Sequence, residues 1–516
     1  EERMVPFPVP SGSYRDLAVV KDGVVWIEVA DRGGELGATR AGVTGEAPSD
    51  VLWHYNLSAR HLDKLCERVD TFSVSGDGER LVVRHRDDTI VVPSSHKVDD
   101  DDPAYIRVDL TRLRRTVNPR AEWRQMFDEN GRLMASHYWR EDMNGVDWDS
   151  VLNRYRPLVD LCHVVDDLHD ILWETVAELN TSHSYVSASG AAGDSDMRAG
   201  LLGADVSSGN DGAKVVRVIP GESSDPRAWS PLRAAGVAVT EGDVIVAVDG
   251  RKVGADGNLG ELLEGSAGRV VELTVRRGEN ERQVAVVPMA DEAPLRYHDW
   301  VASRRRYVEE HSGGRLGYLH VPDMVSDGWA ELHRQIGEAT RHEGVIADVR
   351  FNHGGHTSQL VVERLARRVV GWDYSRWYAT ADTYPQNAVR GPIVMVTNQW
   401  AGSDGDIVAA ATQAMGYAKV IGERSWGGVV GIDGRFDLVD GTSVTQPRYA
   451  GWYGSYGWGV ENHGVDPDIV VTVSPEDWEA DCDVQLDAAI AECLRQLDDK
   501  PAATAPELPG PAFDRC

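Results

Sequence analysis

Apolar and polar residues alternate along the first hundred positions of the chain. Residues 17–29 and 72–83 are two such runs, each interrupted by an Asp-Gly pair, and a short apolar run follows at 89–92. Alternation with a period of two predicts half-buried strands, and an Asp-Gly pair between two runs predicts a hairpin. The sequence therefore predicts an antiparallel, hairpin-rich region over residues 1–112.

Successive hairpins of this kind are typical of the blades of a β-propeller, and this region holds about two blades. Two blades cannot close a ring. We interpret residues 1–112 as the end of a larger propeller, with a small independent sheet as the alternative. The abrupt, strand-like start of the chain favours a C-terminal part of a longer protein.

The hydrophobic period changes to about 3.6 over residues 113–192, which predicts helices. Residues 147–150 offer capping side chains before one of them. One predicted apolar stripe consists of Val164, Leu168, Leu172, Val176 and Leu179. This helical segment ends at His183.

Strand-like sequence returns over residues 193–292, and its order resembles a PDZ domain. The resemblance lies in a Gly-Leu-Leu-Gly loop at 200–203, a short helix at 230–237 and a strand pair at 241–250. PDZ domains bind peptide termini in such a loop. A PDZ-like fold that acts only as a spacer remains the alternative.

Short apolar strands alternate with helical stretches over residues 293–498, which predicts a layered α/β domain. The predicted strands are 314–321, 344–351, 391–397 and 418–423. Residues 499–516 are rich in Pro and Ala and are predicted to be disordered. The whole chain is thus expected to be a multidomain α+β protein.

The amino-acid composition limits the kinds of partner that this protein can bind. A chain of 516 residues is too long for a single hydrophobic core, so several domains are expected. Its 83 acidic and 53 basic residues give a net charge of −30. Such a charge argues against nucleic acid or an anionic membrane as a partner. The five cysteines are widely spread without metal-ligand spacing, and no long apolar run is present, so we expect a cytoplasmic protein with no metal and no cofactor.

Two glycine-containing turns offer chemistry. An apolar strand at 392–397 leads into a tight turn with Ser403, and a helix follows. A serine at a helix N-terminus can be an ordinary cap, or a nucleophile where backbone N–H groups favour negative charge. The earlier strand, ending near Asp348, is followed by Gly354-Gly355, whose backbone could approach an oxyanion.

In this order, the two turns resemble the tail-specific and tricorn peptidases, whose catalytic domain is crotonase-like. The tail-specific branch has a lysine base where this chain has Gly428. The tricorn branch uses a Ser-His pair and a glutamate instead, matched here by Ser182-His183 and Glu461. The chain therefore resembles the tricorn family.

That resemblance implies a serine peptidase acting on oligopeptides in cytoplasmic peptide turnover, downstream of larger proteases. Ser403 would be the nucleophile and His183 the base, with Ser182 oriented by Glu461. It also implies oxyanion donors in the backbone of Gly355 and Asp404. In the substrate pocket it implies Asp373, with a preference for Lys or Arg before the cleaved bond and completion by a neighbouring subunit of a homohexamer.

Two other classes of function remain open. A metal hydrolase could use the side chains near 162–170, where Cys162-His163, Asp166-Asp167 and His169-Asp170 cluster, although no HExxH pattern is present. A catalytically silent, peptide-binding scaffold could use the propeller and PDZ surfaces. The scaffold does not require the four tricorn-like residues together.

Overall fold

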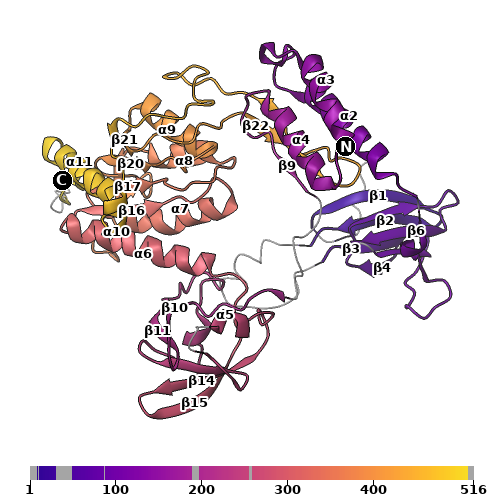
Figure 1. Ribbon diagram of the computed structural model, residues 1–516, viewed down its shortest axis with the longest axis horizontal. Helices are drawn as coiled ribbons and strands as arrows, with labels where there is room; N and C mark the ends of the chain where they lie inside the picture. The colour runs from indigo at the N-terminus through magenta and orange to yellow at the C-terminus, as the bar shows by residue number, and fades with distance from the viewer. Residues whose placement is uncertain are drawn as a thin grey trace, which may run out of the picture. The chain divides into compact units, whose positions relative to one another are not determined.

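The computed structural model describes residues 9, 11–30, 49–86, 88–114, 116–188, 197–254 and 258–508 (Figure 1). These residues form two compact units. The first contains the chain up to Val117 together with Pro220–Thr240, and the second contains Asn118–Ile219 and the chain from Glu241 onward. Of the predicted tail at 499–516, residues 509–516 lie outside the described residues. Residues 501–508 have no regular secondary structure, although the N–H of Ala503 donates to the carbonyl oxygen of Arg390 at 2.8 Å.

The first unit contains two four-stranded antiparallel sheets, each with its strands in sequence order. The first sheet consists of β1 (Tyr14–Val20), β2 (Gly23–Glu28), β3 (Val51–Asn56) and β4 (His61–Glu67). The second consists of β5 (Thr71–Val74), β6 (Arg80–His85), β7 (Asp88–Pro93) and β8 (Ile106–Arg107). The predicted hairpins are thus confirmed, and the assignment of these sheets to a propeller stays a prediction.

The helical segment of the second unit packs around its own core. It consists of α2 (Pro119–His137), α3 (Trp148–Val159) and α4 (Val165–Ala177). Asp147 caps α3 by accepting the N–H of Ser150, as its sequence position indicates. Four residues of the predicted stripe are buried, whereas Val164 is the exposed N-cap residue of α4.

The PDZ-like region of the second unit is an antiparallel sheet with order β10-β11-β12-β14-β15, and β13 pairs with β12. Its elements are β10 (Ala204–Gly209), β11 (Gly212–Val218), β12 (Val244–Val248), β13 (Arg251–Lys252), α5 (Leu259–Leu262), β14 (Val271–Arg277) and β15 (Asn280–Val286). The short helix predicted at 230–237 is a 3-10 turn at Pro231–Arg233, in the segment that belongs to the first unit.

A five-stranded parallel sheet forms the centre of the C-terminal domain, with order β16-β17-β20-β21-β25. The strands are β16 (Leu316–His320), β17 (Gly344–Asp348), β20 (Ile393–Thr397), β21 (Ala418–Gly422) and β25 (Ile469–Val470). The four strands predicted from apolar runs are confirmed. β16, β17 and β20 are buried along their whole length, as expected of a sheet covered on both faces.

Helices cover both faces of this sheet (Figure 1). One core includes residues of α7 (Ser326–Ala339), α8 (Ser358–Leu365) and α9 (Asp404–Met415). The opposite core includes residues of α6 (Ala293–His311) and α11 (Val484–Asp499). In parallel sheets, ligands bind beyond the carboxyl ends of the strands.

The remaining elements are short and lie in the connections. They are α10 (Pro475–Glu479) and the paired strands β18 (Gly371–Asp373) with β19 (Asp382–Tyr384), β22 (Gly431–Asp433) with β24 (Gln446–Tyr449), and β9 (Val186–Ser187) with β23 (Ser443–Val444). The last pair joins the helical segment to the C-terminal domain. The crotonase-like assignment of this domain stays a prediction.

Candidate active site

Ser403 lies in a sharp turn between a buried strand and a helix. β20 ends at Thr397, and Ser403 is the N-cap residue of α9, with φ 58° and ψ −120°. A positive φ is strained for a residue with a side chain, so the surrounding structure must hold it. A turn of this kind exposes the serine hydroxyl beyond the sheet, beside a helix N-terminus that favours developing negative charge.

The glycine pair after β17 lies directly against this serine. A Cβ at Gly354 would lie 2.5 Å from the Cβ of Ser403, and Gly354 has φ +75°. A Cβ at Gly355 would lie 2.2 Å from the carbonyl oxygen of Met324. Because neither position has room for a side chain, glycine is required at both.

Two backbone N–H groups beside Ser403 have no acceptor among the described residues. Within the described ranges, the N–H groups of Gly355 and Asp404 make no hydrogen bond to the protein, whereas Gly354 donates to Asn352 Oδ1 at 2.9 Å. Free donors next to a serine hydroxyl are what an oxyanion hole requires. The Asp404 carboxylate has a separate structural contact, because it accepts the N–H of Ser358 at 3.0 Å and so caps α8.

His183 is fixed to the C-terminal domain by the strand that follows it. β9 pairs with β23, and Tyr185 N–H donates to Thr445 Oγ1 at 2.7 Å. The same threonine hydroxyl donates to the carbonyl oxygen of His183. His183 itself has φ +59°, so its conformation depends on these contacts.

Ser182 and Glu461 form a hydrogen-bond chain behind the imidazole. Ser182 Oγ lies 3.1 Å from His183 Nδ1 and donates to Glu461 Oε2 at 3.0 Å, while Ser182 N–H donates to Glu461 Oε1 at 2.7 Å. The Ser182 hydroxyl has one proton, which it donates in its hydrogen bond to the Glu461 carboxylate. Its oxygen therefore accepts the hydrogen bond from Nδ1–H of His183. This arrangement leaves Nε2 unprotonated and able to act as a base.

The electrostatic surroundings also favour a neutral imidazole. Burial lowers the pKa of His183 below its usual value of 6.5, and the charge of Glu461 and a backbone hydrogen bond with Val430 offset part of this effect. Below its pKa an imidazole carries a proton and cannot accept another. The shift therefore keeps His183 in its basic form at neutral pH.

His183 and Ser403 line the same cavity, which has a volume of about 230 Å³. In the part of the chain that the structure describes, no direct hydrogen bond joins Ser403 Oγ to His183. Catalytic hydrogen bonds are often long before substrate binds, so the shared cavity is the relevant geometry. Of the residues singled out from the sequence, Ser403, His183, Ser182, Glu461, Gly355 and Asp404 are brought together.

Asp373 is not brought to this cavity within the chain. It lies in β18, opposite Asp382 in the β18–β19 ladder, and its side chain is exposed. It does not line the cavity that contains Ser403. A role for Asp373 in substrate binding at the site of the same chain therefore has no geometric support.

Asp406 has a bracing role that its sequence position does not reveal. Its carboxylate accepts the N–H groups of Gly427 at 2.8 Å and Gly428 at 3.2 Å. Burial raises the pKa of Asp406 to about 6, against the lowering effect of these hydrogen bonds and one from Ser425. Glu461 accepts the next two N–H groups, 429 and 430, at 2.8 and 3.0 Å. Loop 427–430 thus links the helix of Ser403 to the glutamate of the hydrogen-bond chain.

Trp426 holds the imidazole from one side. The ring centroids of His183 and Trp426 are 5.4 Å apart, and those of His183 and Tyr185 are 5.7 Å apart, both edge to face. A Cβ at Gly428 would lie 2.1 Å from the Trp426 ring. The indole therefore occupies the space that a side chain at position 428 would need. Asp406 and Trp426 could not be identified as site residues from the sequence, because an acidic residue in the first turn of a helix and a tryptophan in a loop are both common.

The side chains of the alternative metal site have other partners. Asp167 accepts the N–H groups of His163 and Val164 as part of a helix cap, and His169 Nε2 lies 3.1 Å from Thr442 Oγ1. Across the described ranges, no three or more His, Cys, Asp or Glu side chains are arranged to bind a metal ion. Nor do these ranges contain a helix long and apolar enough to cross a bilayer.

Three family models match separate regions of the chain. Residues 315–471 match the model of Peptidase family S41, residues 200–291 match the tricorn protease PDZ domain, and residues 119–177 match the tricorn protease C1 domain. The fold and the site thus place the C-terminal domain in the S41 class of serine peptidases.

Whole-chain relatives give the family. Tricorn protease homolog 1 of Streptomyces coelicolor is 55% identical over 513 residues, which are 98% of this chain and 48% of the relative. Tricorn protease of Thermoplasma acidophilum is 34% identical over 497 residues, 96% of this chain and 46% of the relative. The chain belongs to the tricorn protease family.

A solved structure gives the same result. The crystal structure of the tricorn protease superimposes with a TM-score of 0.86 at 33% sequence identity, covering 96% of this chain and 48% of that one. The chain spans about half the length of the curated relatives that it matches. The similarity covers the residues from the N-terminal sheets to the C-terminal domain.

Proposed function

We propose that this chain is the catalytic part of a serine peptidase that hydrolyses oligopeptides. The observation that carries the proposal is the hydrogen-bond chain from Glu461 through Ser182 to His183, which ends at a cavity shared with the strained Ser403. A partly buried histidine whose Nδ1–H already donates a hydrogen bond is arranged as a general base. A scaffold needs none of these features, so the peptidase is favoured.

In the proposed reaction, Ser403 Oγ attacks the scissile carbonyl carbon while its proton passes to Nε2 of His183. The oxyanion accepts hydrogen bonds from the backbone of Gly355 and Asp404. His183 then protonates the leaving amine as the C–N bond breaks, which leaves an acyl-enzyme on Ser403. A water molecule, deprotonated by His183, hydrolyses this ester and restores the serine.

Further features are proposed from the family. The peptidase would act in cytoplasmic peptide turnover and would assemble as a homohexamer. Asp373 would favour Lys or Arg before the cleaved bond. Because Asp373 is exposed and outside the cavity of its own chain, it is available to the site of a neighbouring subunit. The propeller identity of the N-terminal sheets belongs to the same proposal.

Hydrolysis of fluorogenic peptides with Arg, Phe or Asp before the reporter tests this function. We expect cleavage of the Arg peptide by the wild type and loss of cleavage in Ser403→Ala. Asp373→Ser should reduce the Arg preference and leave cleavage of the Phe peptide. If a folded, hexameric wild type cleaves none of the three peptides, the scaffold replaces the peptidase.

A further inference from the structure

A second cavity adjoins the catalytic one. It has a volume of about 550 Å³ and shares Gln399 and Trp400 with the cavity that contains Ser403. These two residues precede the nucleophile in the same turn. A peptide bound at Ser403 would therefore pass beside this second cavity, which is large enough for a long side chain and part of the backbone.

Aromatic rings form much of its wall. Trp400 and Trp478 are 65% and 78% exposed, and Trp300 contacts Phe351 edge to face with centroids 6.2 Å apart. Trp478 lies in α10, far along the sequence from the other three. Exposed indole rings that converge on a cavity indicate a binding surface, because water solvates their apolar faces poorly and a ligand that covers these faces is stabilised.

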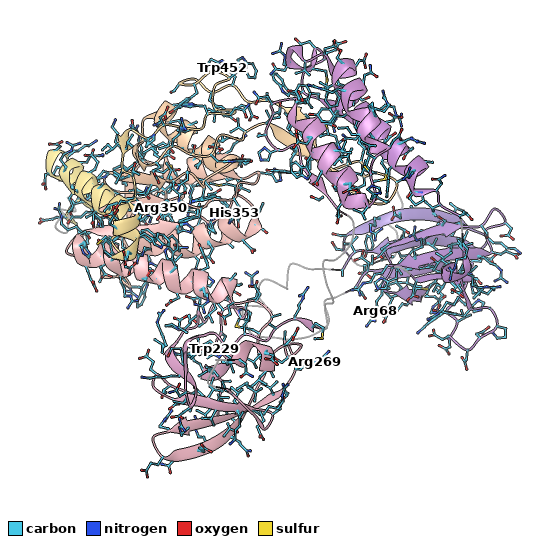
Figure 2. The ribbon with its side chains drawn as sticks, viewed as in Figure 1. Arg68, Trp229, Arg269, Arg350, His353 and Trp452 are labelled. Atoms are coloured by element: carbon cyan, nitrogen blue, oxygen red, sulfur yellow. The ribbon has the colours of Figure 1, made fainter. Side chains whose placement is uncertain are left out.

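The charges of this cavity divide into paired and unpaired groups. Arg350, labelled in Figure 2, is 5% exposed and pairs with Asp348 at 2.7 Å and with Asp483 at 2.9 Å. Arg304 also pairs with Asp483, at 3.2 Å. These arginines are therefore neutralised within the floor of the cavity and do not attract an anionic ligand.

Of the three carboxylates in the lining that form no ion pair among the described residues, Asp477 accepts the N–H of Ser474 at 2.9 Å and two have no partner. Among the described residues, neither Glu423 nor Asp481 forms an ion pair or a side-chain hydrogen bond, and both line the cavity. Unpaired negative charge next to aromatic faces fits a cation, since ring faces attract positive charge and carboxylates neutralise it. An acidic side chain would meet repulsion in the same place.

We propose that this cavity is a substrate subsite for the cationic side chain of a Lys or Arg that lies near, but not at, the cleaved bond. This subsite rests on the proposed peptidase function and is separate from Asp373, which does not line the cavity. Trp400 and Trp478 would stack on the stem and the charged head, with Glu423 and Asp481 neutralising the charge.

A peptide series with Arg before the cleaved bond tests the subsite. One Lys, or the uncharged norleucine, is placed in turn at each other position, and kcat/KM is measured for the wild type. We expect Lys to exceed norleucine by about 5- to 30-fold at one position, mainly through a lower KM, because cation–π contacts have this strength. The advantage should shrink at high salt, which screens the carboxylates.

Variants assign the preference to the cavity. The isosteric double variant Glu423→Gln with Asp481→Asn should bring the Lys-to-norleucine ratio close to one. Trp478→Ala should lower the ratio, and Trp478→Phe should restore most of it. Glu476→Gln is the matched control, because Glu476 is an exposed carboxylate of α10 that does not line the cavity.

Peptide binding, measured without cleavage, distinguishes failure of the subsite from failure of the peptidase function. Anisotropy of the labelled Lys peptide is measured with Ser403→Ala, alone and combined with the double variant. If the wild type cleaves no peptide, but Ser403→Ala binds the Lys peptide through Glu423 and Asp481, the subsite stands and the peptidase fails. If peptides are cleaved without a Lys preference, or if the double variant keeps the preference and its salt dependence, the subsite is overturned. Absence of both cleavage and binding overturns it as well.

Discussion

Glu461 accepts four hydrogen bonds, two from Ser182 and one each from the N–H groups of Val429 and Val430. A single carboxylate therefore sets the proton position on Ser182 and the path of the adjacent loop. A glutamine at this position would keep one acceptor oxygen, but its NH₂ group would be a donor that faces another hydrogen-bond donor. The base and its orientation thus depend on one side chain.

Glu461→Gln should change both rate and pH dependence. The wild-type kcat/KM should rise with pH through a pKa below 6.5, because burial lowers the pKa of His183 and only the neutral ring is a base. The charge of Glu461 raises that pKa, so its loss should shift the acid limb to lower pH. The plateau should fall on the order of a hundredfold or more. An acid limb that stays in place or moves to higher pH contradicts this account.

Gly354→Ala tests the contact between the glycine loop and the nucleophile. The new Cβ would lie 2.5 Å from Ser403 Cβ at a backbone φ of +75°. We expect kcat/KM to fall about a hundredfold or more as the oxyanion donors move away from Ser403. Gly434→Ala is the control, since a Cβ there meets nothing within 4 Å. Equal activity of the two variants would mean that the loop adapts.

At the scale of elements, loop 427–430 connects two parts of the site. Its N–H groups are divided between Asp406, in the first turn of α9, and Glu461. Movement of the loop would change the nucleophile and the base together. It would also release Trp426, the residue just before the loop, from the ring of His183.

Asp406→Asn should weaken this connection without removing a residue of the reaction. We expect kcat to fall on the order of tenfold with KM little changed, because one buried N–H loses its acceptor. Glu310→Gln, an exposed carboxylate at the end of α6, is the control. Steady-state kinetics with one Arg peptide measures both variants. A change confined to KM would show that the loop binds substrate and does not position the base.

The elements differ in how far the sequence predicts them. The strands β16, β17, β20 and β21 follow from short apolar runs, and the hairpins of the first unit follow from alternation with a period of two. The pairing of β9 with β23 does not, because each strand has two residues and the partners lie far apart in the sequence. That pairing brings His183 to the site. In the sequence, His183 is predicted as the base only through the resemblance to a family.

At the scale of the whole molecule, the site lies within one unit. The residues that form it, from Ser182 to Glu461, belong to Asn118–Ile219 and to the segment from Glu241 onward. The N-terminal sheets have a separate core that includes Ile27, Leu52 and Leu81. The curated relatives that this chain matches are about twice as long as the chain.

Removal of residues 1–117 should leave the catalytic centre intact. Because the second unit has its own cores, we expect Ser403 in the shortened chain to react with a fluorophosphonate within about twofold of the full-chain rate. In-gel fluorescence over time measures both rates. Loss of labelling in a folded, shortened chain would show that the sheets of the first unit support the site.

The most direct test of the central claim is the site of fluorophosphonate attachment in the full chain, mapped by mass spectrometry of its peptides. An activated serine attacks such a reagent, whereas an ordinary helix-capping serine does not. We predict one adduct, on Ser403, with labelling strongly reduced in His183→Ala and absent in Ser403→Ala. No adduct on Ser403, or labelling that is unaffected by His183→Ala, would contradict the proposed nucleophile and base.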